Sequence, residues 1–510
     1  MATVTFPMEP RGAFQRIIAD AAPRRWPWAL AAAGLAAGVA AALWYAAAGL
    51  TLSHYDAKAH LVVARRILDS LMPGWIQIGA VWLPLPHLLN ALPVQIDAFY
   101  RTGAFAVAIS VLSFGATIYF VSATVLGATG SRIAAVAGAL AILLNPDVLY
   151  LQSTPMTEPL LMALTAASVW FTVAALRTRS VPDVRRAGWA MAAACLTRYE
   201  AWPVTAALLV LAWASLVAQG QSQRRAWISA GRLAVYPAAA VLAFLVLSRA
   251  TVGEWFVSSG FFVAENAALH HPLRAAVSVW WGLHELTSYP IATLGAAGLV
   301  LLLVRGVRTP AIAAWVPAAA LAAAAALPLY AFYAGHPFRI RYMVPLVPAL
   351  GVGLGCAVGL AGRAKPLLVA AAILALATGP RPLDPAAPMV LEAQWDRANQ
   401  AGRSRVAAHL RDHWDGEPVL ASMGSLAHFM QELSRDGFRI RDFLHEGNGD
   451  LWVSALEYPD PHVTWILVEE VAEGGDVVAA RVRERPLLLS GYDRVAEGGG
   501  VALYRKRPAG

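Results

Sequence analysis

Long apolar segments recur along the first three quarters of the chain. A helix of about 20 apolar residues crosses the hydrocarbon core of a bilayer, and eleven segments of the sequence approach that length. They lie at 27–50, 104–126, 132–149, 157–176, 187–199, 202–219, 231–250, 289–305, 310–328, 342–361 and 366–380. The pattern predicts a polytopic α-helical membrane protein with eleven transmembrane helices, in a membrane domain at residues 27–380.

Positive charge marks one set of connections between these spans. The loops after alternate spans are short, and most carry arginine, as in RTRSVPDVRR and QGQSQRRAW. Such loops stay on the cytoplasmic side, which places the N-terminal segment 1–26 there as well. The odd number of spans then puts the longer connections 51–103, 251–288 and 329–341, and everything after residue 380, on the outer side. We therefore predict a multi-pass protein of the inner (plasma) membrane whose functional site is extracytoplasmic.

The last part of the chain, 381–510, changes from apolar runs to mixed charge and alternating patterns. Residues 388–414 predict an amphipathic helix, PVLASMG a strand, SLAHFMQELSR a helix ended by Gly437, VTWILVEEV a buried strand, and YDRVAEGGGVALYRK a hairpin. This order predicts a small extracytoplasmic α/β domain. It lacks the glycine-rich phosphate loops of nucleotide sites. Three roles stay open for it: covering the membrane part, holding an acceptor, or a purely structural one.

The composition agrees with a membrane protein and excludes several other classes. Hydrophobic residues make up 58% of the chain and charged residues only 14%, and the mean hydropathy is +0.54. The net charge of +8 does not indicate a nucleic-acid partner, because the arginines lie in short loops between apolar segments. The two cysteines, Cys195 and Cys356, both sit in apolar runs, which excludes a disulfide scaffold or a CxxC metal site.

Ionisable residues follow directly after the first span, in the stretch HYDAKAH. In a helix, Asp56 and His60 share one face and Lys58 points away from it. Burial near the bilayer raises the proton affinity of a carboxylate, so Asp56 is a candidate general base. The alternative is a polar cap in which Lys58 and nearby arginines reach the headgroups. Further along the same connection, Gln77 and His87 are candidate ligand-binding groups, in short segments that lie in the membrane plane.

A second acidic residue enters the fourth predicted span, in the stretch STPMTEPLLMAL. Thr154 is expected to cap a helix that begins at Pro155, which places Glu158 in its first turn. The helix dipole alone would stabilise a negative charge there. An acidic residue at the entry of an apolar span nevertheless usually marks a functional site.

Charged residues also stand at the outer ends of later spans. CLTRYEAWP places Arg198, Tyr199 and Glu200 between two spans, where they serve either a structural pairing or substrate contact. AGHPFRIRYMVPLVP places Arg339 and Arg341 at the outer end of the tenth span, where arginine is disfavoured. A lipid phosphate would explain these two arginines, with contact to lipid headgroups as the alternative.

The outer connection 251–288 mixes aromatic residues with His270 and His271, and suggests a lid near an acceptor site. A divalent cation is possible in the outer region. Asp56 and Glu158 are the candidate ligands, since both enter the membrane from the same side and could meet over one cavity. One His and one Asp at the spacing of His60 and Asp56 do not by themselves form a metal motif.

Together these motifs resemble the GT-C superfamily of membrane glycosyltransferases, which includes protein O-mannosyltransferases, the aminoarabinose transferases of lipid A and arabinofuranosyltransferases. The resemblance rests on YDAKAH in the first outer loop, MTEPLL opening the fourth span, TRYEAW between the fifth and sixth spans, and RIRYMVPLVP opening the tenth. Eleven spans followed by an outer soluble domain resemble the A-type architecture of that superfamily.

The resemblance implies an inverting glycosyltransferase that takes its sugar from a polyprenyl-phosphate donor. It implies that Asp56 is the catalytic base and that Glu158 organises the acceptor or a bound ion. It further implies that Arg341, with Arg339, binds the donor phosphate. The other candidate substrate-binding residues are Lys58, His60, Gln77, His87, Arg198, Tyr199, Glu200, His270 and His271.

The partners implied are the polyprenyl-phosphate sugar, an acceptor hydroxyl on a lipid, glycan or protein, and the surrounding membrane lipids. A flippase or transporter of polyprenyl-linked lipid or polysaccharide is the main alternative. A transporter should expose polar residues to both sides in turn, whereas here they are concentrated outside. A non-catalytic scaffold or receptor subunit is a third class, in which Asp56 and Glu158 would be replaceable.

Overall fold

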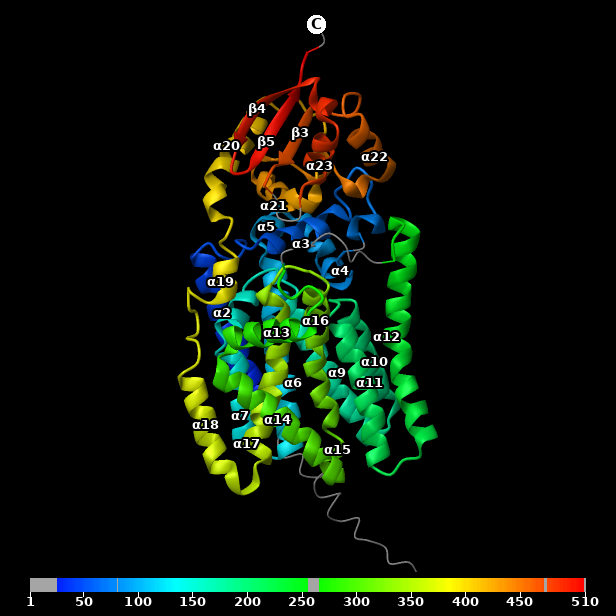
Figure 1. The fold of residues 1–510 in the computed structure, drawn as a ribbon, viewed down its shortest axis with the longest axis vertical. Helices are drawn as coiled ribbons and strands as arrows, with labels where there is room; N and C mark the ends of the chain where they lie inside the picture. The colour runs from blue at the N-terminus through cyan, green and yellow to red at the C-terminus, as the bar shows by residue number, and fades with distance from the viewer. Residues whose placement is uncertain (1–24, 80, 256–265, 472–474, 509–510) are drawn as a thin grey trace, which may run out of the picture.

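The chain folds into a helical bundle at one end and an α/β domain at the other, with a layer of short helices between them (Figure 1). This computed structural model describes residues 25–79, 81–255, 266–471 and 475–508. The predicted cytoplasmic segment 1–26 therefore lies almost wholly outside the described residues. The long axis of the bundle points toward the α/β domain, as expected for helices that cross a membrane beneath a soluble domain.

Each of the eleven predicted spans coincides with a helical segment, but eight of them are long and apolar enough to cross a membrane. Six of the eight are single helices: α2 (Arg25–Ala47), α6 (Ala104–Thr129), α9 (Glu158–Thr178), α11 (Ala201–Ala218), α12 (Gln223–Val252) and α14 (Tyr289–Arg308). The seventh, Val316–Tyr333, consists of the 3₁₀ helix η3 (Val316–Ala325) and α16 (Ala326–Tyr333). The eighth, Ile340–Leu360, consists of the 3₁₀ helix η4 (Ile340–Leu346) and α17 (Val347–Leu360). The other three, α7 (Arg132–Leu143), α10 (Val181–Cys195) and α18 (Lys365–Ala377), have 12, 15 and 13 residues. The short α15 (Pro310–Ala313) precedes η3.

Capping residues explain where two boundaries differ from the sequence prediction. The third predicted span breaks after α7, because Asn145 caps a separate short helix, α8 (Pro146–Leu151), by accepting a hydrogen bond from Val148 N–H at 3.0 Å. Helix α9 begins at Glu158 and not at Pro155, with Thr157 at its N-cap and a proline in its first turn. Glu158 is thus the first residue of its helix, where a carboxylate is favoured by the helix dipole.

The segment Ile340–Leu360 forms the centre of the bundle, and 89% of the residues in its most apolar stretch are buried. Glycines let α14 and α17 approach closely: a Cβ placed on Gly298 would lie 1.8 Å from the carbonyl oxygen of Gly353. Small residues at a helix contact allow this kind of packing in membranes. Because the segment is central, Arg341 near its start is held at the end of the bundle that faces the C-terminal domain (Figure 1).

The outer connection 51–103 folds into short pieces, as predicted: α3 (Tyr55–Arg66), η1 (Trp75–Ile78), α4 (Leu85–Ala91), η2 (Pro93–Gln95) and α5 (Asp97–Thr102). These pieces lie between the bundle and the C-terminal domain (Figure 1). In the connection 251–288, residues 256–265 are outside the described residues, so the predicted lid is not described as a whole. Its last part forms α13 (Pro272–Thr287), which runs across the direction of the spanning helices (Figure 1).

The C-terminal α/β domain contains a five-stranded sheet in the order β2-β1-β3-β5-β4. Strands β1, β2 and β3 are parallel, and β4 and β5 form an antiparallel hairpin beside them. The elements are α19 (Pro388–Glu392), α20 (Gln400–His413), β1 (Val419–Ala421), α21 (Met423–Leu433), β2 (Phe443–Leu444), α22 (Gly449–Glu457), β3 (Trp465–Glu469), α23 (Val477–Glu484), β4 (Tyr492–Gly498) and β5 (Val501–Lys506). The predicted helix 388–414 is in fact two helices, α19 and α20, separated by a 3₁₀ turn.

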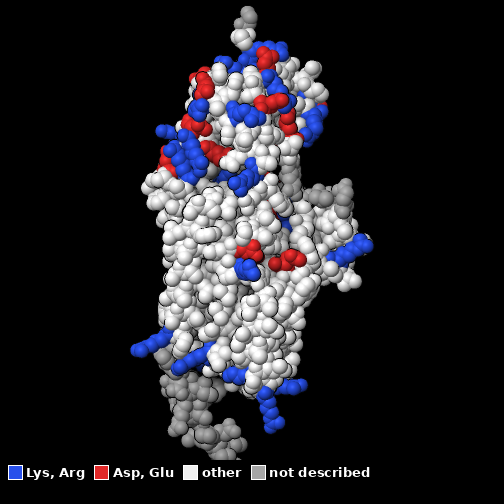
Figure 2. Space-filling view, turned by 90° about the vertical axis from the view of Figure 1, so that its left-hand side faces the viewer, with Lys and Arg blue, Asp and Glu red and all other residues white. Residues whose placement is uncertain are grey.

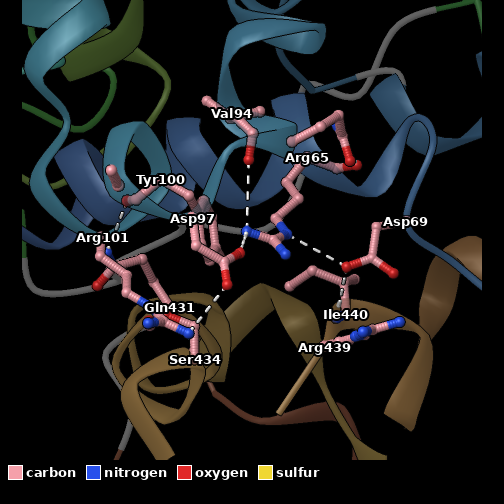
Figure 3. Close-up of polar contacts among 12 residues, drawn as sticks. Arg65, Asp69, Val94, Asp97, Tyr100, Arg101, Gln431, Ser434, Arg439 and Ile440 are labelled. Atoms are coloured by element: carbon pink, nitrogen blue, oxygen red, sulfur yellow. Dashed lines mark hydrogen bonds and ion pairs between the residues drawn. The ribbon is translucent and has the colours of Figure 1, made fainter. Parts of the chain in front are cut away.

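Helix α3 is fastened to the C-terminal domain at its far end (Figure 3). Arg65 donates to Asp69 at 3.2 Å and also pairs with Asp97. Asp69 accepts from the backbone N–H of Ile440 at 3.2 Å and from Arg441 at 2.6 Å, both in the C-terminal domain. Burial favours the neutral acid, yet these hydrogen bonds lower the pKa of Asp69 below its ordinary value. The apolar face of α3 also shares a hydrophobic cluster with α21, so the domain fixes the position of α3.

Charge on the surface follows the same division. On the face shown in Figure 2, basic and acidic side chains gather over the C-terminal domain, and the opposite end of the bundle carries Lys and Arg. Most of the surface between these two ends is uncharged. This distribution is typical of a protein whose middle part lies in lipid.

Candidate functional site

The candidate site is built around the first turn of α3. His54 is the N-cap of this helix, and its Nδ1 accepts a hydrogen bond from the Asp56 backbone N–H at 3.1 Å. Capping satisfies one of the free N–H groups of the first turn. As a result Asp56 is held where the helix dipole favours its negative charge.

Asp56 and Arg341 form an ion pair across 285 residues of sequence. Both side chains are nearly buried, at 13% and 16% exposure. Burial opposes the charged form of Asp56, but the guanidinium of Arg341 lowers the pKa of the carboxyl well below its ordinary value. The two residues that the sequence singled out most strongly therefore share one site, at the end of the bundle that faces the C-terminal domain.

A second charged cluster lies beside this pair. Arg198 bridges Glu158 at 3.0 Å and Glu200 at 2.7 Å, and donates to Thr157 at 3.1 Å. Glu158 is fully buried, and neither of its carboxylate oxygens has a hydrogen bond among the described residues. Its charge is balanced by the ion pair with Arg198, and Arg341 lies within electrostatic reach. One carboxylate oxygen of Glu158 thus remains as an unused buried acceptor.

His60 lines the same side of α3, one turn after Asp56. Its Nδ1 lies 3.1 Å from Nε2 of His87, and its ring packs against Trp82 at 4.2 Å. His87 in turn contacts the carbonyl of Leu83 at 3.0 Å. Burial, followed by the neighbouring His87, lowers the pKa of His60, so its imidazole is neutral and serves as a hydrogen-bonding group rather than a cation.

Other predicted site residues lie elsewhere. Lys58 points away from Asp56, as expected, and pairs with Glu432 of α21. Gln77 is buried at the domain interface, where its amide donates to the carbonyl of Gly447 at 2.8 Å. His270 and His271 are exposed at the start of α13. The structure does not bring these four residues to Asp56.

Two predicted residues lie at the edge of the site in aromatic surroundings. The Arg339 guanidinium stacks over the ring of Trp395 at 5.7 Å. Tyr199 packs edge-on against Trp202 at 5.2 Å. Arg339 lies two residues before Arg341 in the chain, and its guanidinium faces the segment that follows α19.

Sequence reasoning missed a pair that supports Asp56 from the C-terminal part of the chain. Glu392, the last residue of α19, lies 3.4 Å from Nε2 of His54, and both side chains are buried. Because His54 Nδ1 accepts from Asp56 N–H, the ring proton sits on Nε2 and faces the carboxylate. The partners are 338 residues apart. No local pattern could indicate this contact, although His54 itself stands in the HYDAKAH stretch.

The described residues contain no group of three or more His, Cys, Asp or Glu side chains placed to hold a metal ion. Asp56 and Glu158, the candidate cation ligands, are each paired with an arginine. Arginine neutralises these carboxylates in the way a cation otherwise would. A divalent cation at either carboxylate would have to compete with the arginine that is paired with it.

Comparisons with known proteins bear on the fold. No protein-family model matches the sequence, and no curated protein matches it at a significant level. Among solved structures, the chain is similar to ArnT from Cupriavidus metallidurans, crystallised with undecaprenyl phosphate, with a TM-score of 0.54 and 14% sequence identity. The likeness covers 92% of this chain and 98% of the ArnT chain.

The chain has the fold of ArnT. The coverage is broad enough to include both the bundle and most of the C-terminal domain. At 14% identity, the likeness to ArnT speaks for the fold, while the role of each side chain has to be argued from the site.

Proposed function

We propose that this protein is an inverting glycosyltransferase of the plasma membrane. It takes a sugar from a polyprenyl-phosphate donor and transfers it to an acceptor hydroxyl on the extracytoplasmic side. The observation that carries the proposal is the meeting of Asp56 and Arg341 in one nearly buried site. A base and a phosphate-binding cation are the two groups that this reaction needs from the protein. The ArnT structure, which holds undecaprenyl phosphate, supports the donor class.

The reaction follows from these groups. Arg341 holds the donor phosphate, and Asp56 accepts the proton of the acceptor hydroxyl as its oxygen attacks the anomeric carbon from the face opposite the phosphate. The bond between that carbon and the phosphate oxygen breaks, and its electron pair stays on the polyprenyl phosphate, next to the guanidinium. The sugar is inverted, and Asp56 passes its proton to water. The acceptor is a hydroxyl of a lipid, a glycan or a protein.

The second cluster provides a place for the acceptor. Glu158 pairs with Arg198 through one carboxylate oxygen, and its other oxygen is buried and has no hydrogen bond among the described residues. An acceptor hydroxyl that donates a hydrogen bond to this oxygen would be oriented without being deprotonated by it. His60 and Glu200 border the same space as neutral and paired groups.

Arg341→Gln is expected to weaken binding of undecaprenyl phosphate by about 10- to 150-fold, because a charge-assisted hydrogen bond contributes about 1.5 to 3 kcal/mol. Binding is measured on purified protein in lipid nanodiscs. Arg101→Gln, at a half-exposed arginine of α5, serves as the control and should bind like wild type.

Mass spectrometry of the copurified lipid and of the product distinguishes a transferase from a transporter. A flippase moves the donor intact, whereas the transferase leaves polyprenyl phosphate without its sugar.

Labelling of engineered cysteines tests the proposed orientation. Arg435→Cys lies on the exposed surface of the C-terminal domain and Arg308→Cys at the exposed end of α14; the native Cys195 and Cys356 are both buried. A membrane-impermeant maleimide is expected to label position 435 in spheroplasts, and position 308 only after the membrane is permeabilised. The reverse pattern would place the site on the cytoplasmic side and overturn the proposal.

A further inference from the structure

The ion pair between Asp56 and Arg341 joins two groups that the proposed reaction uses separately. Asp56 has to accept a proton, and Arg341 has to hold a phosphate. In the structure the two side chains form an ion pair with each other. The pair is nearly buried, where an unpaired charge is costly, so Arg341 leaves Asp56 only when another anion takes its place.

Arg341 has an unused donor for such a replacement. Its Nε is buried and has no hydrogen-bond partner among the described residues, while Nη1 donates to Asp56. The guanidinium presents its donors as a planar fork that fits two oxygens of a phosphate. A phosphate can therefore satisfy the Nε group that Asp56 leaves unpaired, and it brings negative charge to the same cation.

The other carboxylates of the site already have partners of their own. Glu158 and Glu200 are paired with Arg198, and Glu392 lies against His54. Asp56 is the carboxylate that depends on Arg341. When Arg341 turns to a phosphate, the hydrogen bond from Asp56 N–H to His54 still fixes the first turn of α3, so the carboxylate stays in place.

We propose that the donor phosphate displaces Asp56 from Arg341, so that the carboxylate becomes available as a base only after the donor is bound. This inference rests on the proposed function. It predicts a compulsory order, in which the donor binds before the acceptor hydroxyl can be activated. A carboxylate bound to a guanidinium is a weak proton acceptor, and the pair therefore keeps the site inactive while no donor is present.

Substitution of a residue that only binds the donor weakens donor binding, whereas we expect neutral substitution of Asp56 to strengthen it. Asp56→Asn removes the negative charge that competes for Arg341, and this variant is expected to bind undecaprenyl phosphate about tenfold more tightly than wild type. Asp56→Glu keeps a carboxylate that can pair with Arg341 and should bind close to wild type. Glu392→Gln removes one negative charge from the same vestibule without freeing Arg341, and should change the affinity by less than about threefold.

Affinities are measured by titrating undecaprenyl phosphate into each variant in nanodiscs, with thermal melting as the check of folding. Asp56→Ser replaces Asp56→Asn if the latter does not fold. Equal or weaker binding by the neutral variants, together with the loss expected for Arg341→Gln, would overturn the inference and leave the proposed function intact. The proposed function would instead be overturned if the wild-type protein does not bind undecaprenyl phosphate, or if Arg341→Gln binds it as tightly as wild type. If Glu392→Gln and Asp56→Asn increase the affinity for undecaprenyl phosphate equally, the cause is the loss of any nearby negative charge. That result would also overturn the inference.

Discussion

Replacing Asp56 by asparagine is expected to abolish sugar transfer, lowering kcat by about 10²- to 10⁴-fold, the usual contribution of a general base. Asparagine has nearly the same size and can still accept a hydrogen bond from Arg341, so the site should keep its shape. It cannot take up the proton of an acceptor hydroxyl. Initial rates of transfer from a polyprenyl-phosphate sugar, measured on reconstituted protein at saturating donor, provide the test.

The control is Asp412→Asn, at an exposed aspartate of the C-terminal domain that pairs with the exposed Arg411. It should retain activity, because exposed ion pairs contribute about 0 to 1 kcal/mol to stability. Turnover by Asp56→Asn at the wild-type rate would exclude the base mechanism. Tighter donor binding combined with lost turnover in this one variant would distinguish a base that competes for Arg341 from a residue that only binds substrate.

The location of the site has a physical explanation in the fold. Arg341 is carried by the central helical segment of the bundle, and Asp56 by α3, which the C-terminal domain fastens through Asp69 and the hydrophobic face of α21 (Figure 3). The C-terminal domain also sends Glu392 to His54. The C-terminal domain therefore holds residues of the site in position. Of the roles that the sequence left open for this domain, this favours covering and positioning the membrane part.

The membrane part of the fold could be predicted because lipid imposes a simple rule on sequence. Apolar helices of sufficient length are the elements that satisfy their own backbone hydrogen bonds in a bilayer, so every predicted span coincides with a helix. Their ends were harder to predict. Asn145 and Pro146 start a new helix inside one apolar run, and length alone does not reveal a cap of this kind.

The C-terminal domain shows the same limit. The strands β1 and β3 and the hairpin β4–β5 have clear apolar patterns and turn residues, and they lie where the sequence predicts them. Strand β2 has two residues, Phe443 and Leu444, and owes its existence to pairing with β1. A segment this short carries no periodicity, so it can be recognised only once its neighbour is in place.

The site itself could be predicted only in outline. Asp56, Glu158, Arg198 and Arg341 stand out because ionisable residues are rare at the ends of apolar spans. Which of them pair depends on how helices pack, and that information is spread over the whole chain. Gln77 is an example: its polarity suggested a ligand-binding group, and only the fold shows that its amide donates to a backbone carbonyl of the C-terminal domain.

Replacing Arg198 by methionine is expected to have the largest effect on stability. Arg198 is the common partner of Glu158 and Glu200, whose side chains are 0% and 2% exposed. Removing one member of a buried ion pair costs about 3 to 5 kcal/mol, since the remaining charge has no compensation. Here two carboxylates lose their partner together, so the loss should reach at least this range and appear as a lower melting temperature and less folded protein.

Two comparisons show whether uncompensated charge is the cause. Arg186→Met removes an exposed arginine of α10 that pairs with Asp183 and should leave the melting temperature nearly unchanged. Adding Glu158→Gln and Glu200→Gln to Arg198→Met removes all three charges and should recover most of the lost stability, because a neutral buried cluster needs no counter-charge. If the triple variant melts as low as Arg198→Met alone, the loss comes from packing and hydrogen bonds of the arginine side chain. The cluster would then contribute shape to the acceptor side of the site, and its charge balance would not be what holds Glu158 in place.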